Sequence, residues 1–171
     1  MRVLVAAASK YGGTVGIAEA IGRRLEDAGF DVDVVPIDEA QEVQRYDALV
    51  LGSAVYAGRW LKVARAFVDR HSAEIATRPT WLFSSGPIGD PPKPDADSAV
   101  KLDKIVAATG ARDHRVFAGR LDKSRMAFGD RAVVSAVRSA EGDFRDWEEI
   151  SGWADEIATV LTPSTAVAAT S

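Results

Sequence analysis

One short loop, rich in hydroxyl groups and glycines, carries the most specific chemical signal in the sequence. It lies between an apolar run at residues 3–8 and an amphipathic segment at 17–28, and its members are Ser9, Lys10, Tyr11, Gly12, Gly13 and Thr14. A phosphate group at the start of a helix meets unpaired backbone N–H groups, and nearby hydroxyl groups add further donors. The loop therefore predicts a phosphate site. The alternative is that Gly12, Gly13 and Thr14 only form a tight turn and cap the helix.

Two better-known phosphate motifs do not fit this loop. The pattern G-x-x-x-x-G-K-[ST] needs a Lys-Ser/Thr pair after its last glycine, which Gly12, Gly13 and Gly16 lack. These glycines do not match G-x-G-x-x-G either. The sequence thus disfavours an ATPase and a dinucleotide site.

Strand and helix patterns alternate along the chain. Short apolar or alternating runs predict strands at 3–8, 31–37, 48–53, 80–86 and 115–119. Helical spacing of apolar residues predicts helices at 17–28, 60–75, 96–109 and 146–161. Taken as five β-α units, this pattern predicts an α/β fold: a doubly wound, five-stranded parallel sheet with helices on both faces. We expect a single domain over 1–162 and a flexible C-terminal tail over 163–171.

Two more loops are expected beside the phosphate loop, because ligands of open α/β sheets bind outside the carboxyl ends of the strands. Residues 53–60 follow the strand at 48–53, and residues 84–89 follow the strand at 80–86. Both loops are rich in small residues, and the first also carries two aromatic side chains, Tyr56 and Trp60. The sequence therefore places three candidate ligand loops at one edge of the sheet.

The order of elements and these three loops resemble the flavodoxin family over roughly residues 1–160. The FMN phosphate loop of that family has the form S/T-x-T/Y-G-x-T, and residues 9–14 match every fixed position. The resemblance implies FMN as the cofactor. The cofactor-binding residues that it implies are Ser9, Lys10, Tyr11, Gly12, Gly13 and Thr14 in the phosphate loop; Ala54, Val55, Tyr56, Ala57, Gly58 and Trp60 along one side of the flavin ring; and Ser85, Gly86, Pro87, Ile88 and Gly89 along the other.

For three of these residues the resemblance implies a more specific role at the flavin ring. Tyr56 and Trp60 are candidates for stacking on the ring, and the alternative for each is a partly exposed aromatic residue at the start of a helix. The Gly58 peptide is implied to turn its carbonyl toward the ring nitrogen N5 when the flavin is reduced, because glycine permits such a turn at little backbone cost.

Within that family the chain is similar to the menaquinone-dependent protoporphyrinogen IX dehydrogenase group. The similarity lies in Gly52-Ser53 followed by Gly58-Arg59-Trp60, in Phe67-Val68 with His71, and in residues 117–121 and 146–158. Members of the group carry a basic, partly apolar insertion before the last helix, and residues 121–144 take that place here. This insertion is shorter and less aromatic than the pattern of the group. The similarity implies oxidation of protoporphyrinogen IX or a related substrate, with a quinone as acceptor.

The charge distribution bears on the partners. The chain has 21 basic and 25 acidic residues, a net charge of −4, which argues against general nucleic-acid binding. Residues 112–138 nevertheless hold seven basic and three acidic residues. We expect residues 121–138 to face a large anionic substrate or the inner face of a membrane, with a solvated surface as the alternative. The sequence leaves the oligomeric state open.

Several chemistries are excluded by composition. The chain has no cysteine, so no disulfide, thiolate nucleophile, iron–sulfur cluster or Cys-ligated zinc is expected. Its two histidines, His71 and His114, are too few for a His₃ zinc site; composition leaves mixed histidine and carboxylate ligation open, and no metal-binding residue is predicted. Neither histidine is assigned a role, and the catalytic acid or base stays unknown. The apolar start of the chain is too short for a secretory signal or a membrane span, and we expect a cytoplasmic location.

Three functions remain open at this point. The first is an FMN oxidoreductase that takes hydride from a small-molecule substrate and passes electrons to a quinone or another acceptor. The second is a non-catalytic one-electron carrier, and the third is a flavodoxin fold that no longer holds flavin. The loops nearest the ring contain Arg59 but no acidic residue before Asp90. This favours the oxidoreductase, because a carrier is expected to surround its flavin with carboxylates.

Overall fold

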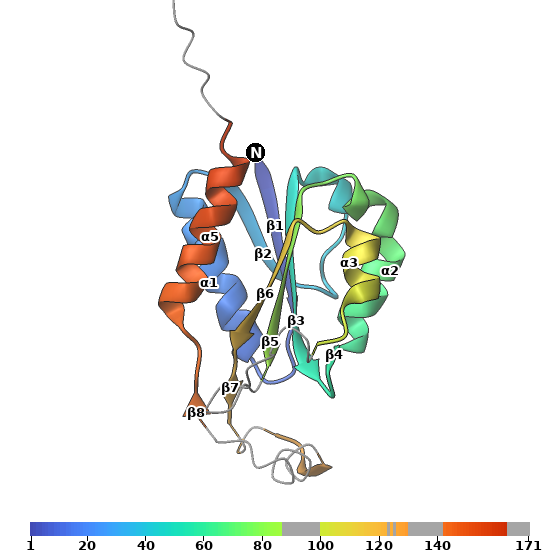
Figure 1. Cartoon of the computed structure of the whole chain (residues 1–171), viewed down its shortest axis with the longest axis vertical. Helices are drawn as coiled ribbons and strands as arrows, with labels where there is room; N and C mark the ends of the chain where they lie inside the picture. Colours follow the sequence, from blue (N-terminus) through green and yellow to red (C-terminus); the bar gives the residue numbers. More distant parts are fainter. Residues whose placement is uncertain (87–99, 123, 125, 130–141, 164–171) are drawn as a thin grey trace, which may run out of the picture.

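A five-stranded parallel sheet forms the centre of the computed structural model, which describes residues 1–86, 100–122, 124, 126–129 and 142–163. The strand order is β2-β1-β3-β5-β6, and a short strand, β4, pairs antiparallel with the end of β3 (Figure 1). These strands are β1 (Arg2–Ala8), β2 (Asp31–Pro36), β3 (Ala48–Tyr56), β4 (Arg59–Trp60), β5 (Thr80–Gly86) and β6 (Asp113–Ala118). The predicted fold class is confirmed.

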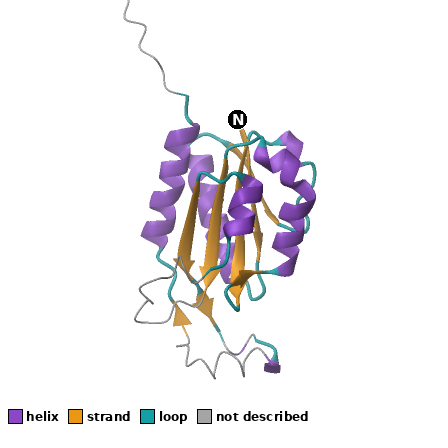
Figure 2. Ribbon diagram, turned by 45° about the vertical axis from the view of Figure 1, so that its right-hand side comes forward, coloured by secondary structure: helices purple, strands orange, loops and turns teal. Residues whose placement is uncertain are grey.

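Helices cover both faces of the sheet. Figure 2 shows α1 (Gly13–Asp27) and α5 (Trp147–Leu161) on one side, with α2 (Lys62–Ala76) and α3 (Asp103–Thr109) on the other. Each face of the sheet has its own hydrophobic core, and successive residues of β1 point alternately into the two cores. Val5 lies in the core under α1 and α5, and Leu4 lies in the core under α2 and α3. The central strands are nearly all apolar because each of their faces is buried.

The connection between β2 and β3 differs from the expected fifth β-α unit. It holds only a 3₁₀ turn, η1 (Val43–Arg45), so the described chain has four α-helices around five parallel strands. Of the residues in this connection, Ile37, Ala40 and Val43 are buried. Three buried positions are too few for the apolar stripe that holds a helix on a sheet.

Two predicted helices begin later than expected. The helix expected from residue 60 starts at Lys62, because a tight turn first reverses the chain and pairs Trp60 with Val55 in the β3–β4 hairpin. Ala57 and Gly58 in that turn have φ angles of 51° and 72°, the combination of a type I′ hairpin. The helix expected at 96–109 spans Asp103–Thr109, and residues 96–99 lie outside the described residues.

The insertion leaves the sheet through a two-stranded ribbon. Strand β7 (Arg120–Leu121) pairs antiparallel with β8 (Gly142–Asp143), and Figure 1 shows the ribbon at the carboxyl ends of the parallel strands. Residues 123, 125 and 130–141 of the insertion and 164–171 of the expected tail lie outside the described residues. Within the part of the chain that the structure describes, no helix is long and apolar enough to cross a membrane.

Candidate functional site

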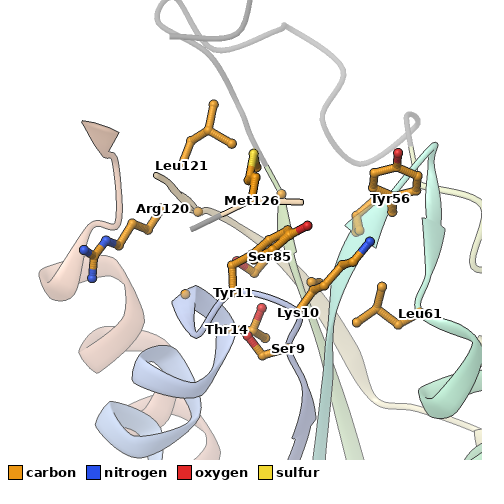
Figure 3. Close-up of a pocket in the computed structure, with 15 residues that line it drawn as sticks. Ser9, Lys10, Tyr11, Thr14, Tyr56, Leu61, Ser85, Arg120, Leu121 and Met126 are labelled. Carbon is orange, nitrogen blue, oxygen red and sulfur yellow. The ribbon is translucent and has the colours of Figure 1, made fainter. Parts of the chain in front are cut away.

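A cleft opens at the carboxyl edge of the sheet, among the loops that the sequence analysis singled out (Figure 3). The empty space among its lining residues, open mouth included, measures about 620 Å³. The described residues that line it are Ser9, Lys10, Tyr11, Gly13, Thr14, Ala54, Val55, Tyr56, Leu61, Ser85, Gly86, Gly119, Arg120, Leu121 and Met126. The fold thus brings together ten of the predicted cofactor-binding residues.

The phosphate loop presents an open helix N-terminus to this cleft. Gly12 adopts a left-handed conformation with φ 83°, and its N–H donates to the Ser9 hydroxyl at 3.0 Å. Among the described residues, no side chain caps the first turn of α1. The first N–H groups of a helix need partners and carry partial positive charge, so this end of α1 fits a phosphate.

Two hydroxyl groups lie at the base of the cleft. Figure 3 shows Ser9 and Thr14 side by side beneath Lys10 and Tyr11. Thr14 is almost fully buried, at 2% exposure, although it is one of the residues that line the cleft. A buried hydroxyl at a helix N-terminus can donate to an anion, which is the role predicted for it.

The charged groups of the cleft are basic. Of its described lining residues, Lys10 and Arg120 are charged, and none is acidic. The Lys10 ammonium lies 5.6 Å from the centre of the Tyr11 ring and 5.2 Å from that of Tyr56. The Arg120 guanidinium turns away from the middle of the cleft in Figure 3 and lies 3.5 Å from the Asp122 carboxylate. Lys10 is therefore the cation nearest to a ligand on the tyrosine side.

Five lining residues were not among the predicted cofactor-binding residues: Leu61, Gly119, Arg120, Leu121 and Met126. Four of the five follow the last parallel strand, β6, and two of these, Leu121 and Met126, belong to the segment 121–138 that was expected to face a substrate or a membrane. A signal was available, because the carboxyl end of β6 belongs to the same sheet edge as the three predicted loops. Gly119 is required there by a close approach, since its N–H donates to the Gly86 carbonyl at 2.8 Å and a Cβ atom would lie 2.9 Å from that oxygen.

The stacking role expected for Trp60 is wrong. The indole ring is 1% exposed in the α2/α3 core, and its N–H donates to the Ser84 hydroxyl at 2.8 Å. The type I′ turn causes this difference, because it places Trp60 opposite Val55 with its ring under the sheet. Tyr56, 41% exposed, lines the cleft and is the remaining aromatic candidate of that loop.

Of the other predicted residues, three that the structure describes do not line the cleft, and three lie outside the described residues. Gly12, Ala57 and Gly58 shape the turns beside it, and Pro87, Ile88 and Gly89 lie outside the described residues. The Gly58 carbonyl accepts a hydrogen bond from the Lys101 N–H at 2.8 Å. A turn of this carbonyl toward a ligand would break that bond.

An arginine clamp joins the insertion ribbon to the phosphate loop. The Arg145 guanidinium donates to both carboxylate oxygens of Asp143, at 2.8 and 2.5 Å, and to the Gly13 carbonyl at 3.3 Å. It also lies over the Trp147 ring, 4.6 Å from its centre. These hydrogen bonds from Arg145 lower the pKa of Asp143 below its ordinary value. The start of α1 is thereby fixed to the stem of the insertion.

The two histidines lie away from the cleft lining. The His114 Nε2 atom is 2.8 Å from the Ser84 hydroxyl, and the His71 ring packs on Phe67 with ring centres 4.8 Å apart. The described residues hold no cluster of three or more histidine or carboxylate side chains that could bind a metal ion.

FMN fits the residues of the cleft. The uncapped start of α1 and the Thr14 hydroxyl suit the phosphate end, while Val55, Leu61 and Met126 supply an apolar wall beside Tyr56 for a flat ring. Ligand sites commonly combine an apolar wall with a few fixed polar groups in this way.

Comparisons with known proteins agree with this geometry. Residues 4–148 match the family model described as "Flavodoxin domain". Protoporphyrinogen IX dehydrogenase [quinone] of Escherichia coli strain K12 is 25% identical over 174 residues, covering 92% of this chain and 95% of that protein. A solved flavodoxin from the domain Archaea superposes with a TM-score of 0.64 at 18% identity, covering 94% of this chain and 98% of that one. Flavodoxin 1 from Bacillus cereus gives a TM-score of 0.64 at 16% identity, covering 95% and 100%. The chain belongs to the flavodoxin family.

Proposed function

We propose that this protein is an FMN-dependent oxidoreductase that oxidises protoporphyrinogen IX, or a related substrate, with a quinone as acceptor. The observation that carries FMN binding is the uncapped N-terminus of α1 at the base of the cleft. The substrate class is supported by the 25% identity to a protoporphyrinogen IX dehydrogenase over nearly the whole of both chains.

The charges of the cleft favour an oxidoreductase over an electron carrier. No acidic side chain is found among the described lining residues, whereas Lys10 lies beside both tyrosines. A cation in this position stabilises negative charge on a bound ligand, and fixed charges of this kind are one means by which a protein tunes a cofactor.

Each part of the cleft has a task in this proposal. Bound FMN supplies hydride transfer at its ring. Thr14 and the first turn of α1 hold the phosphate, and Lys10 adds positive charge nearby. Val55, Leu61 and Met126 exclude water from one side of the ring position, which strengthens the electrostatic interactions there.

Replacing Thr14 with alanine tests cofactor binding. T14A removes one hydroxyl donor to a charged group, about 1.5–3 kcal/mol, so we expect roughly 10- to 100-fold weaker FMN binding in a fluorescence titration of the apo-protein. T159A is the matched control, because Thr159 donates only to the Asp155 carbonyl on the exposed side of α5. Equal FMN affinities of T14A and the parent would mean that Thr14 does not contact the phosphate and only helps to form the start of α1.

An anaerobic assay separates the two remaining functions. We expect the FMN-loaded protein to couple protoporphyrinogen IX oxidation to reduction of a water-soluble quinone, and to take up two electrons in one step during a reductive titration. Two well-separated one-electron steps without quinone reduction would instead identify a carrier.

We also propose that residues 121–138 approach an anionic membrane surface. Phe128 is 87% exposed in this segment, and the neighbouring Met126 lines the cleft. The Ala127 N–H lies 3.4 Å from the Tyr11 hydroxyl, so the segment adjoins the phosphate loop. The basic residues Lys123, Arg125, Arg131 and Arg138 lie outside the described residues.

Phe128 provides the test of this surface. F128S should weaken binding to vesicles of anionic lipid, measured by sedimentation, roughly 10- to 100-fold, because an exposed apolar side chain that enters the interface contributes about 1.5–3 kcal/mol. V160S is the control, because Val160 is also exposed, at 55%, but lies at the C-terminal end of α5, whereas the insertion precedes the N-terminal end of that helix. Equal sedimentation of both variants and the parent would argue for a solvated insertion.

A further inference from the structure

A second cavity, of about 450 Å³, lies beside the β3–β4 hairpin and shares no lining residue with the cleft. Its lining contains two arginines, two lysines, one carboxylate and one aliphatic side chain: Arg59, Arg65, Lys101, Lys104, Asp103 and Ile105. Four cations and one acid therefore meet in one concave site, in a chain whose net charge is −4.

Backbone contacts fix the position of these cations. The Lys101 N–H donates to the Gly58 carbonyl at 2.8 Å, which holds the start of the α3 region against the hairpin. The Arg65 Nε atom donates to the Trp60 carbonyl at 3.1 Å, so the guanidinium of an α2 residue is held at β4. Leu102 and Ile105 are buried, at 5% and 7% exposure, and anchor the segment that carries both lysines.

The ion pairs found among the described residues involve other arginines of the protein rather than the cations of this cavity. Arg24, Arg115 and Arg145 all form ion pairs. Arg59, Lys101 and Lys104 form none with the part of the chain that the structure describes. Like charges held together repel one another, and an anionic ligand would relieve that repulsion. The guanidinium groups offer the planar fork that matches a carboxylate.

The β3–β4 hairpin contributes to the lining of both the cavity and the cofactor cleft. Tyr56 and Arg59 are opposite residues of the β3–β4 pair, with Tyr56 lining the cleft and Arg59 lining the cavity. Directly opposite residues of an antiparallel pair have Cα atoms about 5 Å apart. A ligand that extends over the edge of this hairpin would reach both sites. The concave shape favours a small molecule over a flat protein surface.

We propose that this basic cavity binds the carboxylate groups of the substrate while the rest of the substrate lies at the mouth of the cleft. This inference rests on the proposed function, because it assigns the recognition of a dicarboxylate substrate to Arg59, Arg65, Lys101 and Lys104. It adds a substrate subsite lined by the hairpin residue Arg59, outside the lining of the cofactor cleft.

The test compares two charge-matched double variants in the FMN-loaded full-length protein. R59Q/K104Q removes two cations of the cavity. R23Q/R70Q removes two exposed cations elsewhere on α1 and α2. The probes are protoporphyrin IX, which is stable and carries two carboxylates, and its dimethyl ester, which has the same ring without the charges. Binding is followed by porphyrin fluorescence at low and high salt.

We expect protoporphyrin IX to bind R59Q/K104Q about tenfold more weakly than the parent, and R23Q/R70Q about as well as the parent. The difference should shrink at high salt, because exposed charges are screened. The dimethyl ester should bind all three proteins equally weakly. Equal binding of protoporphyrin IX by both variants and the parent would overturn the subsite and leave the proposed function standing.

A second arm separates the subsite from the substrate itself. Citrate is titrated into isotopically labelled protein, and backbone amide shifts are recorded. Shifts confined to residues 59 and 101–105 that vanish in R59Q/K104Q would support a carboxylate site even if the parent does not bind porphyrin, in which case the proposed substrate is wrong. The inference would be overturned if citrate causes no such shifts in the parent and if the parent and R59Q/K104Q bind protoporphyrin IX with the same affinity.

Discussion

Replacement of Arg145 with methionine tests whether the insertion stem supports the phosphate loop. Methionine keeps much of the aliphatic length but removes the two hydrogen bonds to Asp143, the one to the Gly13 carbonyl and the contact over Trp147. Two consequences are expected, one for the stability of the protein and one for FMN binding.

The expected loss of stability follows from the exposure of the two partners. The Arg145 side chain is 10% exposed and that of Asp143 is 43% exposed. Breaking a buried ion pair costs about 3–5 kcal/mol and breaking an exposed one about 0–1 kcal/mol. A pair with one buried partner falls between these ranges, so R145M should lower the free energy of unfolding by about 2 kcal/mol.

The chain offers a matched control at the other end of α1. Arg24 makes an equally short bidentate pair with Asp155, at 2.6 and 2.9 Å, but both side chains are nearly half exposed. R24M should therefore destabilise the protein less than R145M. It should also leave FMN affinity unchanged, because Arg24 lies far along the helix from the phosphate loop.

Two assays decide the matter. Urea unfolding followed by circular dichroism measures stability, and a fluorescence titration measures FMN affinity, which should fall about fivefold in R145M for the loss of one hydrogen bond to the loop. The reasoning is refuted if R145M and R24M lose the same stability, since burial would then not set the strength of the clamp. Unchanged FMN affinity in R145M would show that the ribbon and the phosphate loop are independent.

Two further predictions concern buried and titrating groups. W60F should lower the free energy of unfolding by about 0.5–1.5 kcal/mol, because the buried Ser84 hydroxyl loses its indole donor but keeps His114 as a partner. A titration should give unaltered FMN affinity, and weaker FMN binding would show that Trp60 contributes to the site after all. Since Arg145 depresses the pKa of Asp143 in the folded state, the stabilisation by Asp143 is complete above about pH 5 and is lost as the pH falls through the lower folded pKa. D143N should accordingly flatten the fall of stability between about pH 5 and pH 3 in urea unfolding, and an unchanged slope would contradict this assignment.

The fold could be predicted because its signals are local and repeated. The strands at 3–8 and 48–53 have uninterrupted apolar runs, which are typical of strands covered on both faces, and the structure buries them in that way. The helix at 60–75 was placed two residues too early for an equally local reason. Trp60 fits a helical stripe, but the positive φ angles of Ala57 and Gly58 reverse the chain first. Alanine at position 57 gives no signal of this turn, because type I′ turns favour asparagine, aspartate or glycine there.

The site residues that belong to one contiguous motif could be predicted from the sequence, whereas those that tertiary contacts bring together from distant segments could not. Residues 9–14 form a contiguous motif, so their place at the start of α1 followed from the sequence. Gly119 and Leu121 enter the cleft only because β6 ends beside β5 and the ribbon folds back, which is a tertiary effect. Arg145 reaches Gly13 from 132 positions away in the sequence, and no local pattern predicts that contact.

Likeness of fold does not decide between an oxidoreductase and an electron carrier, because one fold serves both. The charges around the β3–β4 hairpin bear on that choice. Lys10 lies beside Tyr56 of the hairpin, and Arg59 of the same hairpin lines a basic cavity. A carrier that docks on basic partners gains from carboxylates around its cofactor, whereas these cations would repel such partners. The same cations attract an anionic small molecule to the edge where the cofactor cleft opens, and this is the arrangement that an enzyme acting on a dicarboxylate needs.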